Sequence, residues 1–183
     1  MSVKEVREEI YQIVADTVGI LDRIYKGKYE SDKRFLIEVT NKAVELAYSD
    51  ISDNDAIREL GEGWVAEETW AIALYCAIRH IDSVEDAIIA SVNHDGDSDS
   101  TGSVCGNIMG AIYGYEHIKE HNRFCPDGKQ LEDTLELSEI ILALANDLST
   151  GCIISEYDPI DTPEKQQWYE RYVLMEPSGI GNK

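Results

Sequence analysis

The residues most suited to chemistry lie in one short run, 93–102, which reads Asn-His-Asp-Gly-Asp-Ser-Asp-Ser-Thr-Gly. Three of its side chains, Asp95, Asp97 and Asp99, are carboxylates at alternate positions, with no lysine or arginine among them. Carboxylates this close repel one another unless a cation or hydrogen bonds compensate their charge. Carboxylate and hydroxyl oxygens are the ligands that Mg²⁺, Mn²⁺ and Ca²⁺ prefer, so the run predicts a site for a hard cation.

Two other structures could use this run, an EF-hand calcium loop and a helix cap. An EF-hand calcium loop does not fit, because counting from Asp95 puts Ser100 where the turn glycine is needed, and counting from Asp97 leaves no glutamate at the final position. A helix cap formed by Asp99, Ser100 or Thr101 needs no metal and stays open. Because a cap explains only one or two of these residues, a metal site is the favoured hypothesis.

The rest of the chain predicts an all-α fold, since no segment alternates as a β-strand would. Apolar residues recur at helical spacing in five segments, 6–24, 35–47, 65–79, 84–92 and 131–148. The third of these is apolar on most faces, which is typical of a central, buried helix.

Helix starts can also be predicted. Ser83 with Asp86 forms a capping box for the helix over 84–92. Thr162 and Pro163 are typical of the cap and first turn of a short last helix.

A further helix is expected to begin near Thr101 and to carry glycines at 102, 106, 110 and 114 on one face. Each glycine in a helix interior costs about 1 kcal/mol relative to alanine. We therefore expect a neighbouring helix to pack against this stripe at close backbone distance and to fix the acidic run at one helix end.

The length, composition and charge of the chain limit the kinds of protein that it can be. A chain of 183 residues with 43% hydrophobic residues predicts one helical domain, 1–183, in which 150–183 is a peripheral tail. A net charge of −20 repels phosphate backbones and argues against nucleic acid as a partner. With no apolar run of membrane-spanning length, no secretory signal and four widely spaced cysteines, we expect reduced thiols in a cytoplasmic protein without a membrane partner.

At the level of motifs, the segment 96–102 with the glycines that follow it resembles the C-terminal metal motif of the ADP-ribosylglycohydrolase family. This family includes dinitrogenase-reductase-activating glycohydrolase and hydrolases that release ADP-ribose from arginine or serine. The segment 60–76, which begins Leu-Gly-Glu-Gly-Trp, resembles the glycine-aromatic turn and buried helix that precede this motif. The likeness spans residues 55–116 and implies a compact orthogonal helical bundle.

The resemblance also implies a site that holds two Mg²⁺ or Mn²⁺ ions between carboxylates and a threonine. By motif position, Asp97, Asp99 and Ser100 would be metal ligands, with serine standing where threonine is commoner. Trp64, preceded by Gly63, falls at the aromatic position that lies near the ADP-ribose.

Two neighbours of the motif are candidates for substrate binding. Asp95 lies just outside the usual pattern and would stand behind the ligands, while His94 would either contact substrate or only hydrogen-bond the loop.

The function implied is metal-assisted hydrolysis of the bond between ADP-ribose and a protein side chain. The family's N-terminal half carries a Thr-Asp-Asp motif with the remaining ligands and an acidic catalytic residue, and this sequence contains no Thr-Asp-Asp. The chain thus corresponds to the C-terminal half of such an enzyme, completed by an N-terminal polypeptide or acting as a homodimer, with its catalytic residue unknown. The alternative is a non-catalytic module that binds ADP-ribose, a cation or a protein.

Other side chains have simpler interpretations. Glu67 and Glu68 complement the helix dipole in a first turn, although one of them could face the site. His117 and His121 are one turn apart but lack a third ligand nearby, which favours a solvated helix face. Cys105 is interpreted as a packing residue, because no histidine partner is evident.

Overall fold

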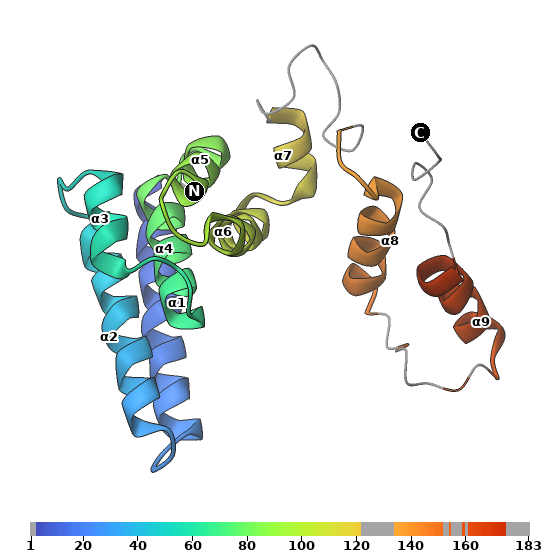
Figure 1. Cartoon of the computed structure of the whole chain (residues 1–183), viewed down its shortest axis with the longest axis horizontal. Helices are drawn as coiled ribbons and strands as arrows, with labels where there is room; N and C mark the ends of the chain where they lie inside the picture. The colour runs from blue at the N-terminus through green and yellow to red at the C-terminus, as the bar shows by residue number, and fades with distance from the viewer. Residues whose placement is uncertain (1–2, 122–133, 152–153, 155–158, 160, 175–183) are drawn as a thin grey trace. The chain divides into compact units, whose positions relative to one another are not determined.

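The computed structural model describes residues 3–121, 134–151, 154, 159 and 161–174 (Figure 1). All regular elements in these ranges are helical, which confirms the predicted all-α class. The chain divides into two compact units, Met1–Arg123 and Phe124–Lys183, each of which is treated by itself below. Within the described ranges, no helix has the length and apolar character needed to cross a membrane.

Among the described residues, the first unit holds seven helices and the second holds two helices and a π-helical turn. In the first unit they are α1 (Val3–Ile24), α2 (Glu30–Ala47), α3 (Asp53–Leu60), α4 (Ala66–Arg79), α5 (Val84–Val92), α6 (Ser98–Tyr113) and α7 (Tyr115–His121). In the second they are α8 (Ser138–Ser149), α9 (Pro163–Tyr169) and the π-helical turn Glu170–Leu174.

Helix α4 is the centre of the first unit, as its all-round apolar sequence predicts. Thr69 and every residue from Ala71 to Ile78 are buried. The helix packs against α2, α5 and α6, and Figure 1 shows α2 and α6 on different sides of it. Because α4 has neighbours around its circumference, its position is rigidly defined, and segments attached to its ends inherit that rigidity.

Two predicted N-cap residues are confirmed, but the reciprocal bond of the Ser83–Asp86 capping box is not formed, because the Ser83 N–H donates to the His80 carbonyl oxygen at 3.0 Å. The Ser83 hydroxyl accepts a hydrogen bond from the Asp86 N–H at 3.2 Å, and α5 follows directly. The Thr162 hydroxyl accepts one from the Lys165 N–H at 3.2 Å, with Pro163 as the first residue of α9.

Two short helices were not predicted. Helix α3 follows Ser52, whose hydroxyl accepts a hydrogen bond from the Asp55 N–H at 3.3 Å, and it ends at Gly61. Its eight residues are too few to show a clear apolar period in the sequence. Helix α7 is separate from α6 because Gly114 adopts a φ of 76° and ends α6 there.

The predicted start of the last long helix also needs correction. Helix α8 begins at Ser138, after a turn that includes Leu137 with a φ of 59°, rather than at residue 131; residues 131–133 lie outside the described ranges. Helix α6 likewise begins at Ser98, three residues before the predicted Thr101.

Close backbone packing along the glycine stripe of α6 is contradicted. A Cβ at Gly102 would lie 2.5 Å from Val92 Cγ1, which is a side-chain atom, and one at Gly106 would lie 3.7 Å from Ile88 Cδ1, an ordinary contact. A Cβ at Gly110 would meet nothing within 4 Å. Side chains of α5, not its backbone, therefore fill the space beside α6.

The aromatic tail packs within the second unit. The Tyr172 hydroxyl donates to Asp147 Oδ2 of α8 at 2.7 Å, and the Trp168 ring meets the Tyr172 ring edge-on at 5.4 Å. These contacts join the aromatic residues near the end of the chain to α8.

We expect Leu74→Ala to lower the free energy of unfolding by about 2–5 kcal/mol, because it leaves a cavity in a fully packed helix. Leu74 is 2% exposed, whereas Ile13 on α1 is 63% exposed, so Ile13→Ala should change stability by less than about 0.5 kcal/mol. Urea unfolding followed by circular dichroism measures both. Equal losses in the two variants would contradict the central position of α4.

The buried thiols give a second prediction. Burial raises the pKa of Cys105 to about 11 and shifts the pKa of Cys76 further upward, so both stay protonated near pH 8. Iodoacetamide should therefore leave both unlabelled in the native protein and label both in concentrated urea. Peptide mass spectrometry distinguishes them from Cys125 and Cys152, which lie outside the described residues. Native labelling of Cys76 would contradict its buried position.

Candidate metal and substrate site

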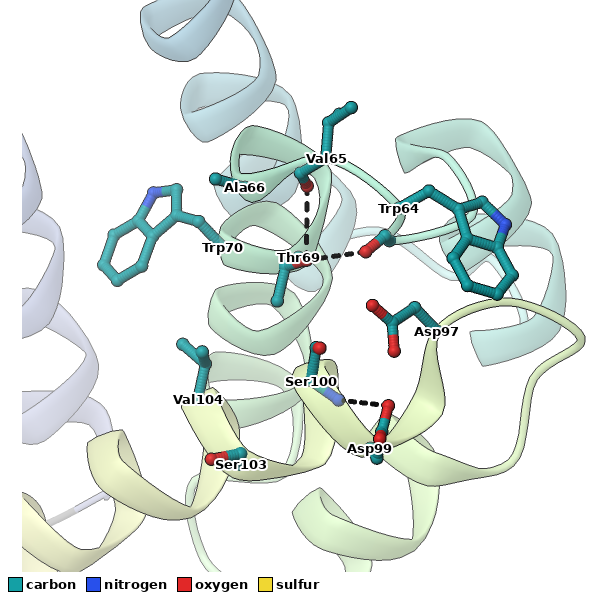
Figure 2. Close-up of a pocket in the computed structure, with 11 residues that line it drawn as sticks. Trp64, Val65, Ala66, Thr69, Trp70, Asp97, Asp99, Ser100, Ser103 and Val104 are labelled. Carbon is teal, nitrogen blue, oxygen red and sulfur yellow. Dashed lines mark hydrogen bonds between the residues drawn. The ribbon is translucent and has the colours of Figure 1, made fainter.

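A cavity of about 720 Å³ lies between the turn that precedes α4 and the first turns of α6 (Figure 2). Five of the seven predicted site residues line it: Gly63, Trp64, Asp97, Asp99 and Ser100. In Figure 2 the Asp97 carboxylate lies between the Trp64 ring and the Asp99 and Ser100 side chains. The fold thus brings together two motifs that are separated by the whole of α4 and α5.

The acidic side chains are not used as helix caps. Asp97 is the N-cap residue of α6, yet its side chain makes no capping hydrogen bond. Asp99 Oδ1 accepts from the N–H of Ser100, the next residue, at 2.9 Å. The cap alternative is therefore wrong for the residues proposed, since the helix begins at Ser98 and the Asp97 carboxylate faces the cavity.

Hydrogen bonding with the Asp99 carboxyl group, and then with Ser100, lowers the pKa of Asp97. A lowered pKa means that Asp97 keeps its negative charge to more acidic pH than an ordinary aspartate. Two neighbouring carboxylates repel each other, and a divalent cation compensates such a pair. The donor chemistry of Asp97, Asp99 and Ser100 therefore fits a hard metal ion.

Thr101 holds the acidic loop in place, a role that the sequence analysis did not predict. Its fully buried hydroxyl lies 2.6 Å from the Ser91 carbonyl oxygen, to which it donates, and 2.9 Å from His94 Nε2, from which it accepts. His94 Nδ1 in turn accepts from the Gly96 N–H at 3.1 Å. Because the Gly96 N–H donates to Nδ1, the tautomer with its hydrogen on Nε2 suits both contacts, and the two contacts hold the loop against the start of α6.

The signal for Thr101 was present in the sequence, four residues after Asp97. A threonine one helical turn inside an N-terminus lies on the same face as the cap residue and points back toward the loop. The sequence analysis considered Thr101 only as a cap candidate and as the start of the helix.

The structure does not bring His94 and Asp95 into the cavity with Trp64. They line a second cavity of about 460 Å³ on the other side of the loop, together with Asn54 and Arg58. Of the two roles considered for His94, the hydrogen bond within the loop is present. Direct contact of either residue with substrate stays a prediction.

The turn before α4 is held by side chains in the first turn of that helix. Glu68 Oε2 accepts from the N–H groups of Glu62 and Gly63, both at 3.1 Å, and the Thr69 hydroxyl donates to the Gly63 carbonyl oxygen at 2.7 Å. Gly63 has a φ of 81°, in the region that favours glycine. Trp64 is thereby presented with 67% of its surface exposed, and its indole N–H donates to Glu62 Oε2 at 3.1 Å.

The turn and the acidic loop are joined through one residue, Glu62. Its carbonyl oxygen accepts from the Asp97 N–H at 2.8 Å. A Cβ at Gly96 would lie 1.8 Å from that same oxygen, so only glycine permits this approach. The position of Asp97 is therefore set by the turn that carries Trp64.

The other candidates lie outside this cavity. The Cys105 thiol is buried and donates to the Ala87 carbonyl oxygen at 3.6 Å, as expected of a packing residue. His117 stacks on Tyr113 with ring centroids 4.9 Å apart, and the side chain of His121 lies outside the described residues. Glu67 lines neither of the two cavities.

A family model described as ADP-ribosylglycohydrolase matches residues 2–153, a range that includes the turn, α4 and the whole acidic run. The chain belongs to the ADP-ribosylglycohydrolase family. Membership agrees with the all-α fold of the described residues. It also agrees with the order of the two motifs along the chain, both of which line the cavity. Members of the family typically bind Mg²⁺.

The chain is similar to part of ADP-ribosylhydrolase ARH3. It is 31% identical over 138 residues to the protein of Mus musculus, covering 69% of this chain and 36% of that protein. It is 23% identical over 145 residues to the protein of Homo sapiens, covering 74% of this chain and 39% of that protein. The chain thus matches less than two fifths of the length of these curated relatives. No solved structure gave a significant match.

We expect Gly96→Ala to lower stability by about 1–3 kcal/mol, because the new methyl group collides with the Glu62 carbonyl oxygen and separates the loop from the turn. Gly110→Ala is the matched control: its methyl group meets nothing within 4 Å inside a helix, so it should stabilise by about 0.5–1 kcal/mol. Urea unfolding of both variants tests the pair. A neutral Gly96→Ala would contradict the close approach.

Proposed function

We propose that this chain is the metal-binding, C-terminal portion of an ADP-ribosylglycohydrolase, which acts on the bond between ADP-ribose and a protein side chain. The observation that carries the proposal is the common cavity of Trp64, Asp97, Asp99 and Ser100. The Asp97 side chain makes no capping hydrogen bond with the helix that it precedes. The carboxylate and hydroxyl oxygens of Asp97, Asp99 and Ser100 are the kind that a hard cation prefers, so these residues are suited to binding one.

In this proposal Asp97, Asp99 and Ser100, which line the cavity, supply part of a dinuclear metal site. Two carboxylates and a hydroxyl suit one Mg²⁺ or Mn²⁺ ion, which keeps several water ligands. Among the described residues, no group of three or more histidine, cysteine, aspartate or glutamate side chains is placed to hold a metal. A pair of ions needs further ligands, and we propose that a complementing polypeptide with the family's Thr-Asp-Asp motif supplies them. A second copy of this chain as a homodimer is the other arrangement.

Each side chain has a stated task in this proposal. When bound, the divalent ions would orient the ribose through its vicinal hydroxyl groups. The exposed Trp64 ring offers a flat apolar face against which a ribose or base can pack. Asp97 and Asp99 place negative charge where the departing side chain leaves oxocarbenium character on the anomeric carbon. Asp95 and His94 would act from behind the loop.

A non-catalytic module that binds ADP-ribose, a cation or a protein is the second candidate. The observation that favours it is that the lining of the cavity, among the described residues, includes two acidic side chains, Asp97 and Asp99, and no third. Such a site binds without the groups that a hydrolase needs. Location in the cytoplasm is proposed with either function, in keeping with the buried, free Cys76 and Cys105 thiols.

The metal site can be tested with the chain alone. Calorimetric titration with Mn²⁺ should give heat with the wild type and none with the Asp97→Ala/Asp99→Ala double variant, because the variant loses both carboxylates. Asp86→Ala removes an exposed carboxylate on α5 and should titrate like the wild type. Equal heats from the wild type and the double variant would overturn the site.

Catalysis is tested by release of ADP-ribose from arginine- and serine-modified peptides. With Mn²⁺ present, we expect the chain alone to release none above background and a mixture with a family N-terminal half to release it. The Asp97→Ala/Asp99→Ala variant should abolish turnover of the mixture. Turnover by the chain alone would contradict an incomplete site, whereas an inactive mixture that still binds ADP-ribose would favour the non-catalytic module.

A further inference from the structure

We propose that Glu68 is a positioning residue: its carboxylate holds the turn 61–63, and through Glu62 it fixes the Asp97 ligand. Its effect on metal binding rests on the proposed function, while its effect on the loop does not. Glu68 does not line the cavity, so it would act through the backbone rather than by touching a ligand.

Glu68 first binds the backbone of the turn. A single carboxylate oxygen, Glu68 Oε2, accepts two adjacent backbone N–H groups, those of Glu62 and Gly63, at 3.1 Å each. The two bonds fix consecutive residues of the turn to one side-chain atom. Gly61 lies directly against this carboxyl group, since a Cβ there would be 2.4 Å from Glu68 Cδ. A side chain at residue 61 would therefore displace the Glu68 carboxyl group from the turn.

The second step is the rigidity of the anchor. Glu68 stands in the first turn of α4, directly before the buried Thr69 and the fully packed core of the helix. Thr69 holds the same turn from its other end by donating to the Gly63 carbonyl oxygen. The turn is thus fixed to the most constrained element of the unit, and the position of Glu68 follows from the packing of α4.

The third step carries the constraint to Asp97. Glu62 is held on both sides: its N–H donates to Glu68, and its carbonyl oxygen accepts from the Asp97 N–H at 2.8 Å. Loss of the first bond frees the residue that makes the second. Gly63 also lies against Thr101, with 3.1 Å between a Cβ built there and Thr101 Cγ2. Displacement of the turn would therefore disturb the start of α6 as well.

Substitutions at residue 68 can distinguish a positioning role from an effect of its negative charge alone. Glu62, Asp97 and Asp99 are all acidic, so a glutamate at 68 adds to their mutual repulsion and to the attraction for a cation. Glu68→Gln removes the charge and keeps an oxygen that can accept both N–H groups. Glu68→Asp keeps the charge and withdraws the carboxylate by one methylene group. A positioning role predicts that Gln preserves function and Asp does not.

Hydrogen exchange of the loop tests the inference without a metal. We expect amides of 93–97 to exchange about ten-fold faster in Glu68→Ala and Glu68→Asp than in the wild type, and Glu68→Gln to stay near the wild type. Glu67→Ala is the matched control, because it removes the same charge from the same helical turn. Should Glu68→Ala fail to fold, the comparison of Asp with Gln decides. Unchanged exchange in Glu68→Asp, or equal loosening in Glu67→Ala, would overturn the proposal.

Titration with Mn²⁺ gives the functional readout. We expect Kd to rise about ten-fold in Glu68→Asp and to change less than about three-fold in Glu68→Gln, in line with the effect of residues that support metal ligands. If the wild type binds no Mn²⁺, the proposed metal site fails, while the exchange result still decides the role of Glu68. A loss of affinity in Glu68→Gln equal to that in Glu68→Asp would show that charge, not position, matters, and would overturn the inference.

Discussion

The candidate site depends on one backbone hydrogen bond, from the Asp97 N–H to the Glu62 carbonyl oxygen at 2.8 Å. It joins two segments that are far apart in the sequence, the turn before α4 and the loop before α6. The approach is possible because residue 96 is glycine, and any side chain there would occupy the position of the Glu62 carbonyl. Through this contact the Trp64 ring and the two carboxylates come to share one cavity.

Both sides of that contact are supported by buried or half-buried polar groups. On one side, Glu68 and Thr69 bind the backbone of the turn from the first turn of α4. On the other, the buried Thr101 hydroxyl ties α6 to the end of α5 and to the His94 ring. Each group has its hydrogen-bond partners, so the arrangement is specified without the cost of an unpaired buried polar atom. The packed core of α4 fixes the whole assembly, because both motifs are attached to helices that contact it.

We propose that the site is one part of a larger one. The candidate metal ligands are two carboxylates and the Ser100 hydroxyl, and the chain matches less than two fifths of the length of its curated relatives. Like charges placed together without a cation are unfavourable, and the lowered pKa of Asp97 depends on hydrogen bonding with Asp99 and Ser100. A cation and further ligands from another polypeptide would relieve that repulsion. The proposal of a partner polypeptide is thus supported by the repulsion between Asp97 and Asp99 as well as by family membership.

The sequence by itself determined the helical class, the central position of α4 and the membership of Asp97, Asp99 and Ser100 in one local motif. These follow from periodicity and from spacing over a few residues, which local geometry controls. Only the tertiary structure decided that Trp64 faces the same cavity, that His94 and Asp95 face another, and that the glycines of α6 do not bring helix backbones together. It also separated Glu68 from Glu67, which are equivalent in sequence. The physical reason is that each of these facts depends on how one segment packs on another distant in the chain, and spacing along the chain does not encode that packing.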